Sequence, residues 1–295
     1  MNTNGNTYTV IYSTILVVLV AAILAFVAMS LQGKQNENVK LETISKLLGA
    51  ASQADESLVM DENADVLALY AEKIEDAFYV NGLGEKVGQM NTGKENVKDI
   101  QVTTTSDLKK QNDIIKKIED GQGDLASTLA MPVYVFDING NDVTVIPCYG
   151  AGLWGPIWGY LAINADGKTI DGAVFDHKGE TPGLGAKIAD APFYNAFHGK
   201  TLNLDGDEVF TVAKASAITE PDHSVDAISG ATITSQALGK SINLWAKYYR
   251  PYLAGAAAAH QAGTAAVSDS TVTCCAPADS VKTAGTAEVK VNVEE

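Results

Sequence analysis

Cysteine is scarce in this chain. The 295 residues contain three, Cys148, Cys274 and Cys275, and no CxxC pair or Cys/His cluster accompanies them. The sequence therefore lacks the ligand pattern of a zinc site or of a self-contained iron–sulfur centre. Three cysteines also give no disulfide framework. The histidines are not spaced as ligands, so we expect no metal site.

Positive charge is also in short supply. The formal net charge is −15, which leaves no basic face for a nucleic-acid partner. Apolar residues make up 46% of the chain, so it can bury a core. We expect an acidic outer domain that does not bind nucleic acid.

The N-terminus lacks the basic residues of a signal peptide. No Lys or Arg occurs in residues 1–8, and the run from Thr9 to Leu31 carries no charge. A helix over 9–31 would be about 34 Å long, enough to cross a hydrocarbon core of about 30 Å. No A-x-A-like cleavage site follows it, which favours an uncleaved transmembrane helix.

The side of the membrane is less clearly marked. Lys34, Lys40 and Lys46 follow the helix, interspersed with acids. Under the positive-inside rule they place the large domain in the cytoplasm, but long domains translocate regardless of flanking charge. Residue physics alone leaves the side open.

Residues 32–130 are predicted to form a helical or mixed part of the extramembrane domain. Apolar residues recur at helical spacing over 38–51 and 64–79, the latter through Val66, Tyr70, Ile74 and Phe78. A third helix, over 106–118, is rich in lysine and acid.

Residues 131–253 change to a strand-rich pattern. Strands over 133–136 and 143–146 flank Asn139-Gly140, and strands over 157–163 and 170–175 flank a second turn, so two antiparallel hairpins are expected. Helices over 189–197 and 231–249 and a strand over 209–213 complete an α+β fold. Beyond Leu253 the composition narrows to Ala, Thr, Val, Gly and Ser, and we expect 254–295 to be a disordered tail.

The segment Asp226-x-x-Ser229-Gly230-Ala231-Thr232 opens the last predicted helix. Its small residues let a bulky group approach the backbone, and a helix N-terminus offers free N–H groups to an anion. Ordinary N-capping by Ser229 or Thr232 is the alternative, and the residues alone favour it.

Two glycine-rich segments precede it. The string Glu180-Thr181-Pro182-Gly183-Leu184-Gly185 predicts an irregular loop that can bring backbone N–H groups to a planar ring, or simply a strand-to-helix connection. The segment Gly150-Ala151-Gly152-Leu153-Trp154-Gly155 satisfies GxGxxG, but a strand rather than a helix follows, which argues against a dinucleotide site. Ser229 lacks the GxSxG elbow of a hydrolase.

Together, the three motifs resemble the FMN-binding domain family and, within it, the C subunits of the sodium-translocating NADH:quinone oxidoreductases. The resemblance implies that FMN is bound covalently to Thr232 by a phosphoester bond, which an FMN transferase makes. It implies that the other motif residues serve the transferase or the phosphate, that the PGLG loop contacts the isoalloxazine ring, and that the GLWG segment walls the pocket. The implied contacts are Asp226, Ser229, Gly230 and Ala231, then Glu180, Thr181, Gly183, Leu184 and Gly185, then Leu153 and Trp154, with Lys187 a weaker candidate.

The resemblance also implies the setting. The chain would be an electron carrier without catalytic residues of its own, in an NADH:ubiquinone reductase that transports sodium, beside the A, B, D, E and F subunits. It would lie in a bacterial inner membrane with its flavin domain on the periplasmic side, against the lysine signal. An anchor without ionisable residues is a poor sodium path, so ion transport would belong to other subunits.

Two alternatives stay open. The G subunit of the related Rnf ferredoxin:NAD oxidoreductase shares the anchor, the PGLG loop and the SGAT site, but not the GLW segment. A membrane-anchored adapter without redox function would keep the anchor and use the glycine loops only as turns.

Overall fold

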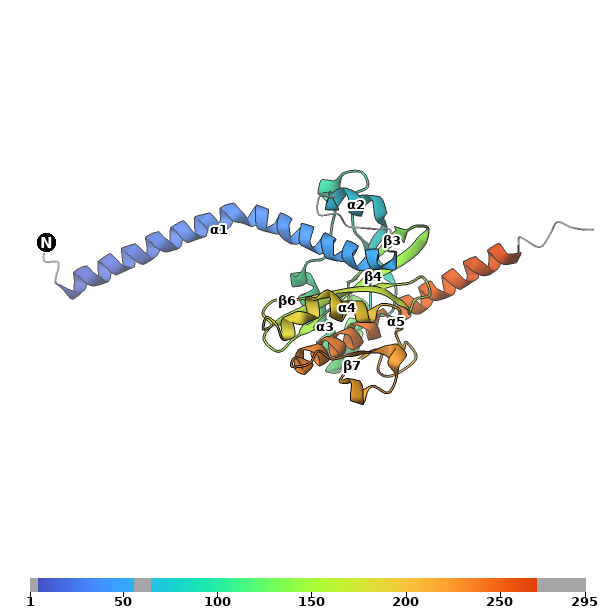
Figure 1. Cartoon of the computed structure of the whole chain (residues 1–295). Coiled ribbons are helices and arrows are strands. Elements are labelled where there is room, and N and C mark those ends of the chain that lie inside the picture. The colour runs from blue at the N-terminus through green and yellow to red at the C-terminus, as the bar shows by residue number, and fades with distance from the viewer. Residues whose placement is uncertain (1–4, 56–64, 270–295) are drawn as a thin grey trace, which may run out of the picture.

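A six-stranded antiparallel sheet forms the centre of the molecule. The computed structural model describes residues 5–55 and 65–269. The strands lie in the order β2-β1-β3-β4-β5-β6 (Figure 1). Their bounds are Ile74–Val80 for β1, Lys86–Gln89 for β2, Met131–Ile138 for β3, Asn141–Ala151 for β4, Pro156–Ile163 for β5 and Ile170–His177 for β6. β1 and β2, from the region 32–130, thus share one sheet with strands of the region 131–253.

The two predicted hairpins are present. β3 and β4 are joined at Asn139-Gly140, where both residues have positive φ, 55° and 82°. Positive φ at both central positions is the signature of the type I′ turn, and Asn-Gly is the pair that adopts it most readily. β5 and β6 form the second hairpin, with Ile157 opposite His177.

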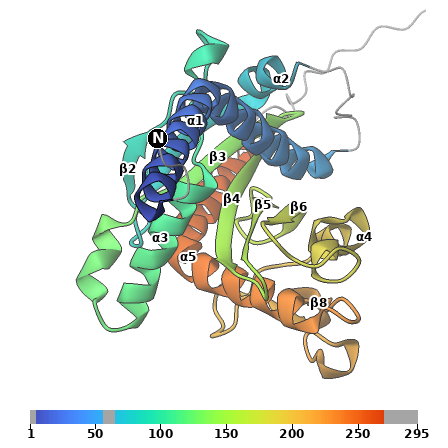
Figure 2. The same ribbon diagram turned by 90° about the vertical axis from the view of Figure 1, so that its left-hand side faces the viewer.

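Helices cover both faces of the sheet. α1 (Asn6–Ala51) and α2 (Val66–Lys73) pack on one face around buried residues such as Leu47, Tyr70 and Phe136. α3 (Thr105–Glu119) and α5 (Thr232–Asp269) pack on the other, around Trp245 and Leu238 (Figure 2). Because both faces are covered, the central strands read as near-continuous apolar runs rather than as alternating ones.

One continuous helix links the apolar N-terminal run to the domain. α1 would be about 69 Å long at 1.5 Å per residue and projects away from the sheet (Figure 1). Within the described residues it is the one helix long and apolar enough to cross a membrane. Its apolar side chains from Val10 to Leu31 are exposed, with Phe26 at 75%, whereas Ile44 and Leu48 are fully buried against the sheet.

Three predictions about secondary structure were wrong in part, those for residues 64–79, 189–197 and 254–295. The helix expected over 64–79 ends at Lys73, and Ile74–Val80 is strand β1, because pairing with β2 and β3 outweighs the local helical spacing. The disordered tail expected over 254–295 is wrong for its first part, because α5 continues to Asp269. Alanine dominates that stretch and is the strongest helix former. Residues 270–295 lie outside the described residues.

The segment from 185 to 231 is mostly short turns. The helix expected over 189–197 is reduced to α4 (Ala191–Tyr194), between 3₁₀ turns at Gly185–Ala189 and Asn195–Phe197. The strand expected over 209–213 is β7 (Thr211–Ala213), and it pairs in parallel with β8 (Ser224–Asp226). This small sheet fixes the chain just before α5 begins.

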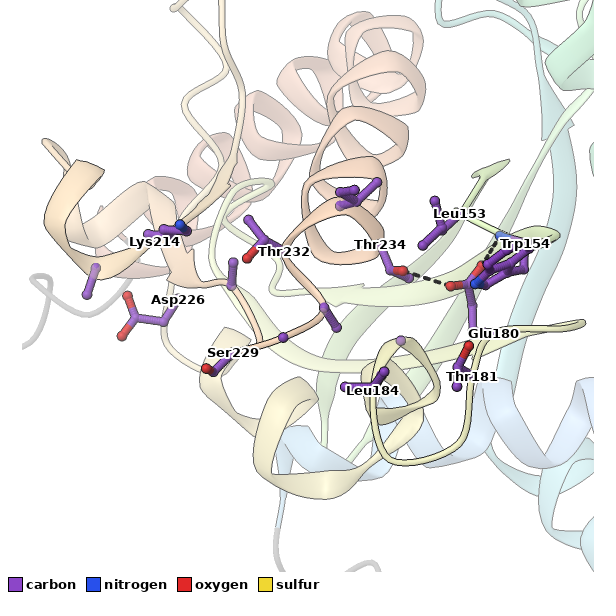
Figure 3. Close-up of a pocket in the computed structure, with 16 residues that line it drawn as sticks. Leu153, Trp154, Glu180, Thr181, Leu184, Lys214, Asp226, Ser229, Thr232 and Thr234 are labelled. Carbon is purple, nitrogen blue, oxygen red and sulfur yellow. Dashed lines mark hydrogen bonds between the residues drawn. The ribbon is translucent and has the colours of Figure 1, made fainter.

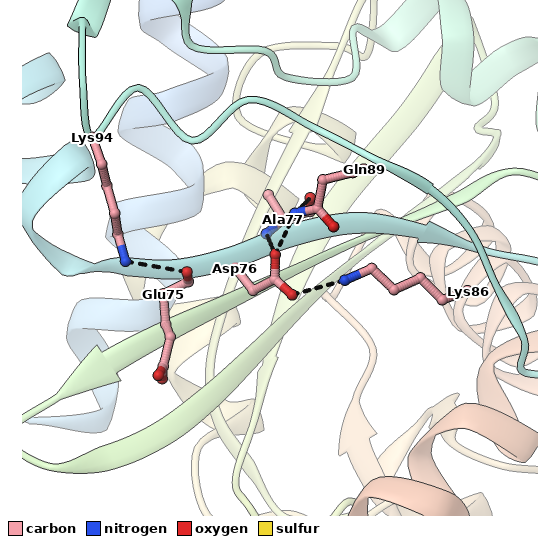
Figure 4. A network of polar contacts seen from close by, with 6 residues as sticks. All are labelled: Glu75, Asp76, Ala77, Lys86, Gln89 and Lys94. Carbon is pink, nitrogen blue, oxygen red and sulfur yellow. Dashed lines mark hydrogen bonds and ion pairs between the residues drawn. The ribbon is translucent and has the colours of Figure 1, made fainter.

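A polar network ties the edge strand β2 to β1. The Asp76 carboxylate accepts hydrogen bonds from Lys86 Nζ at 2.9 Å, from the Gln89 side chain and from the Ala77 N–H (Figure 4). Partial burial would raise the pKa of Asp76, but these donors outweigh it and hold the pKa below its usual value. The neighbouring residue Glu75 shifts in the opposite direction, because the negative charge of Asp142 raises the pKa of Glu75.

Asp76→Asn is expected to lower the melting temperature at pH 7, because it removes the acceptor for a lysine. A carboxyl whose pKa is depressed on folding stabilises above its unfolded value, near 3.8, and that stability disappears as the pH falls through the folded pKa. The difference from wild type should therefore shrink as the pH falls below 3.8 and vanish below the folded pKa. Asp142→Asn is the matched control and should not lower the melting temperature. Equal losses at pH 7 and pH 3 would contradict the electrostatic account.

Candidate functional site

A cavity of about 610 Å³ lies where the three sequence motifs meet (Figure 3). The turn after β4, the loop after β6, the end of β7 and the start of α5 form its walls. Eleven of the twelve residues implied as cofactor contacts line this cavity. They are Leu153, Trp154, Glu180, Thr181, Leu184, Gly185, Asp226, Ser229, Gly230, Ala231 and Thr232. Gly183 and the weaker candidate Lys187 do not line it.

Glu180 joins two of these walls. Its carboxylate accepts the Trp154 backbone N–H at 2.9 Å and the Thr234 hydroxyl at 2.7 Å. Glu180 is 3% exposed, and burial alone would raise its pKa, but the N–H and hydroxyl donors outweigh burial and lower it. Both oxygens of this carboxylate therefore accept a hydrogen bond from the protein. Glu180 lies between the GLWG turn and helix α5 and holds the two together.

The loop after β6 is shaped by that same carboxylate. A Cβ atom at Gly185 would lie 2.5 Å from Glu180 Oε2 and 2.8 Å from Thr234 Oγ1, so a larger residue there would have to displace these two hydrogen-bonded side chains. Gly183 has φ of 77°, a left-handed conformation that favours glycine. With these two glycines the loop turns tightly, and Leu184 is left 45% exposed on the cavity wall.

The GLWG turn supplies the facing apolar wall. The Gly152 N–H donates to the Gly155 carbonyl at 2.8 Å, which closes the turn before β5. Leu153 and Trp154 at its tip are 49% and 70% exposed. Large apolar side chains held in the open by hydrogen-bonded turns are typical of surfaces that receive a ligand or partner.

The other end of the cavity is polar. α5 begins at Thr232, which is half-buried, and in the part of the chain that the structure describes neither Ser229 nor Thr232 caps the helix. The serine that bonds locally is Ser235, which accepts the Ile228 N–H. Thr234 differs from Thr232 because it is 1% exposed and donates to Glu180. The capping alternative for the motif is thus not what the structure contains.

Sequence reasoning missed Lys214 and Ala215, which line the cavity from the segment after β7. Ala213 pairs with Asp226 in the β7–β8 register, so the next residue, Lys214, lies close to the motif. No local pattern marks this, since a parallel pairing between separate segments brings them together. Ala227, Ile233 and Thr234 line the cavity too and were also outside the predicted set.

The chemistry that the cavity can perform on its own is limited. Residues 5–55 and 65–269 contain no group of three metal-ligating side chains. The buried Cys148 has its pKa raised to about 12 by desolvation, which keeps the thiol unreactive. No histidine lines the cavity to activate a hydroxyl. The cavity has apolar side chains at one end, Leu153, Trp154 and Leu184, and polar ones around the start of α5 at the other, so it can hold an amphipathic ligand.

Comparison with known proteins identifies the family in which this arrangement of motifs occurs. A family model described as FMN-binding domain matches residues 152–247, which contain all of the predicted contacts. The chain is 30% identical over 248 residues to the C subunit of the Na(+)-translocating NADH-quinone reductase of Haemophilus ducreyi, covering 81% of this chain and 90% of that one. The corresponding protein of Neisseria meningitidis serogroup A is 32% identical over 202 residues, covering 66% and 75%. The crystal structure of the one from Parabacteroides distasonis aligns with a TM-score of 0.58 at 30% identity, covering 76% and 96%. The predicted family and the predicted α+β fold are confirmed.

Proposed function

This chain belongs to the family of the C subunits of Na(+)-translocating NADH-quinone reductases, and we propose that it carries FMN esterified to Thr232 and relays electrons between neighbouring subunits. The observation that supports this most is the gathering of three separate motifs around one cavity (Figure 3). Membership in an oxidoreductase complex follows from the family, whereas the ester and the relay are our proposal.

The cavity suits FMN in size and in polarity. Its volume of about 610 Å³ lies within the range of small-molecule sites. Leu153, Trp154 and Leu184 offer apolar surface for the isoalloxazine ring, and the start of α5 offers free N–H groups and a positive dipole end for the phosphate. Bound there, FMN would supply one- and two-electron transfer, which no side chain lining the cavity provides.

Thr232 is the acceptor that the geometry favours. Its side chain lines the cavity and makes no hydrogen bond among the described residues, whereas the Thr234 hydroxyl is buried and already donates to Glu180. A transferase can reach the first hydroxyl without disturbing the fold. The exposed residues Asp226, Ser229 and Gly230 before it are open to recognition by that enzyme.

The residues of the chain divide the remaining tasks. Glu180 holds the GLWG turn against α5, and the apolar walls limit the access of water to the ring. α1 anchors the domain, because its exposed apolar stretch from Val10 to Leu31 matches a lipid core. We place the domain on the periplasmic side, as the family resemblance implies. We assign sodium transport to other subunits, because the anchor carries no ionisable residue. The region boundaries at residues 31 and 130 remain part of this proposal, whereas the boundary expected at residue 253 falls inside α5.

Two competing assignments remain to be compared with this proposal. The Rnf G subunit would carry the same ester, but it lacks the GLW segment. That segment walls the cavity here and favours the sodium-translocating complex. A non-redox adapter would carry no flavin.

In-gel fluorescence tests the proposal directly. The full chain, expressed in membranes together with an FMN transferase, should give a fluorescent band under ultraviolet light after denaturing electrophoresis, and it should give none without the transferase. A dark band from wild-type protein in the presence of an active transferase would overturn the proposal and favour the adapter.

A further inference from the structure

The charged groups that line the cavity are few and unevenly placed. They are Glu180, Asp226 and Lys214. Glu180 lies at the apolar end, and its carboxylate is occupied by Trp154 and Thr234. Lys214 and Asp226 lie at the other end, near Ser229 and Thr232 (Figure 3). The polar end therefore contains one cation and one anion.

The position of Lys214 is set by the fold. β7 ends at Ala213, which is paired with Asp226, so Lys214 leaves the small sheet beside the motif and at the start of α5. Its side chain is exposed, and it makes no hydrogen bond or ion pair among the described residues, even with Asp226. The ammonium group is thus available to a ligand that occupies the cavity.

The Lys214 ammonium group balances the negative charge of Asp226 at the polar end of the cavity. A phosphate held near Thr232 would share this end of the cavity with the exposed Asp226 carboxylate, whose charge repels it. The N-terminus of α5 offers the equivalent of only about half a positive charge. One ammonium group offsets the carboxylate, and lysine binds phosphate as a compact point charge. Without Lys214, Asp226 would be the one charged side chain among the described residues that line this end of the cavity.

We infer that Lys214 binds the FMN phosphate and makes the site selective for phosphorylated flavins over phosphate-free ones. The inference rests on the proposed function. Lys214 acts on the end of the ligand that carries no redox chemistry, so it is a specificity-determining residue. It acts before the ester forms, by holding the phosphate at Thr232, and afterwards by neutralising the phosphodiester.

Binding of free flavins by the full chain carrying Thr232→Ala tests this, because no ester can then form at Thr232. Adding Lys214→Ala should weaken FMN binding about tenfold or more, the effect of one charge-assisted contact, and leave riboflavin binding unchanged. Lys214→Arg should keep most of the preference for FMN, and added salt should reduce it. Lys187→Ala is the control, since Lys187 follows the PGLG loop but lies outside the cavity.

Equal weakening of both flavins would show that Lys214 only supports the fold, and no change in either would show that it does not meet the phosphate. Phosphorus NMR of the flavinylated chain gives a second reading that needs no binding measurement. The ³¹P shift of the ester should move in Lys214→Ala and not in Lys187→Ala, and an unmoved shift overturns the inference. Absence of the ester in the wild-type chain would instead overturn the proposed function.

Discussion

Thr232→Ala is expected to abolish covalent flavin attachment completely, with the membrane anchor and the fold intact. The phosphoester needs a hydroxyl at this position, and alanine leaves none. Thr232 is half-buried on the cavity wall, without a hydrogen-bond partner among the described residues, so its removal costs the fold little. Ultraviolet fluorescence of the denatured band, normalised to the amount of protein, measures the result.

Two matched variants separate the hydroxyl from its surroundings. Thr232→Ser keeps a hydroxyl and should retain at least part of the labelling. Thr234→Val removes the neighbouring hydroxyl, which donates to the Glu180 carboxylate at 2.7 Å, and should stay fluorescent despite a stability loss of about 2 kcal/mol. Labelling that survives Thr232→Ala but disappears with Thr234→Val would move the acceptor to Thr234.

The parts of the fold that the sequence predicted well are those with local signals. Asn139-Gly140 specifies its own turn through two positive φ angles, and the hairpin around it follows. The charged helix over 106–118 and the uncharged run over 9–31 have composition patterns that no tertiary contact needs to complete. α3 and α1 accordingly contain these segments.

The parts that it did not predict depend on contacts between distant segments. Ile74–Val80 reads as a helix by itself and becomes a strand because β2 and β3 lie beside it. Lys214 belongs to the cavity only because β7 pairs with β8. Glu180 was expected as a flavin contact from its place in the motif. Its partners Trp154 and Thr234 are 26 and 54 residues away, and nothing in the ETPGLG string reveals them.

Those partners make Glu180 the residue whose loss should affect both walls of the cavity at once. Glu180→Ala leaves the part-buried Trp154 N–H and the buried Thr234 hydroxyl without their acceptor. An unmet buried donor costs about 1–3 kcal/mol and a part-buried one costs less, so the free energy of unfolding should fall by about 2–4 kcal/mol. The GLWG turn would also no longer be tied to α5, and the yield of covalent flavin should fall with it.

The stability of the flavin-free protein decides whether Glu180 positions the walls or contacts the ring. If it positions them, Glu180→Ala lowers the denaturation midpoint of the chain expressed without transferase, where no ester has formed. Glu180→Gln keeps the volume and one acceptor oxygen, and should lose less of both stability and labelling. Because the hydrogen bonds lower the folded pKa of Glu180, the wild-type advantage is present above the unfolded value, near 4.5, and is lost as the pH falls through the folded value. An unchanged midpoint together with impaired labelling would instead assign Glu180 to the flavin.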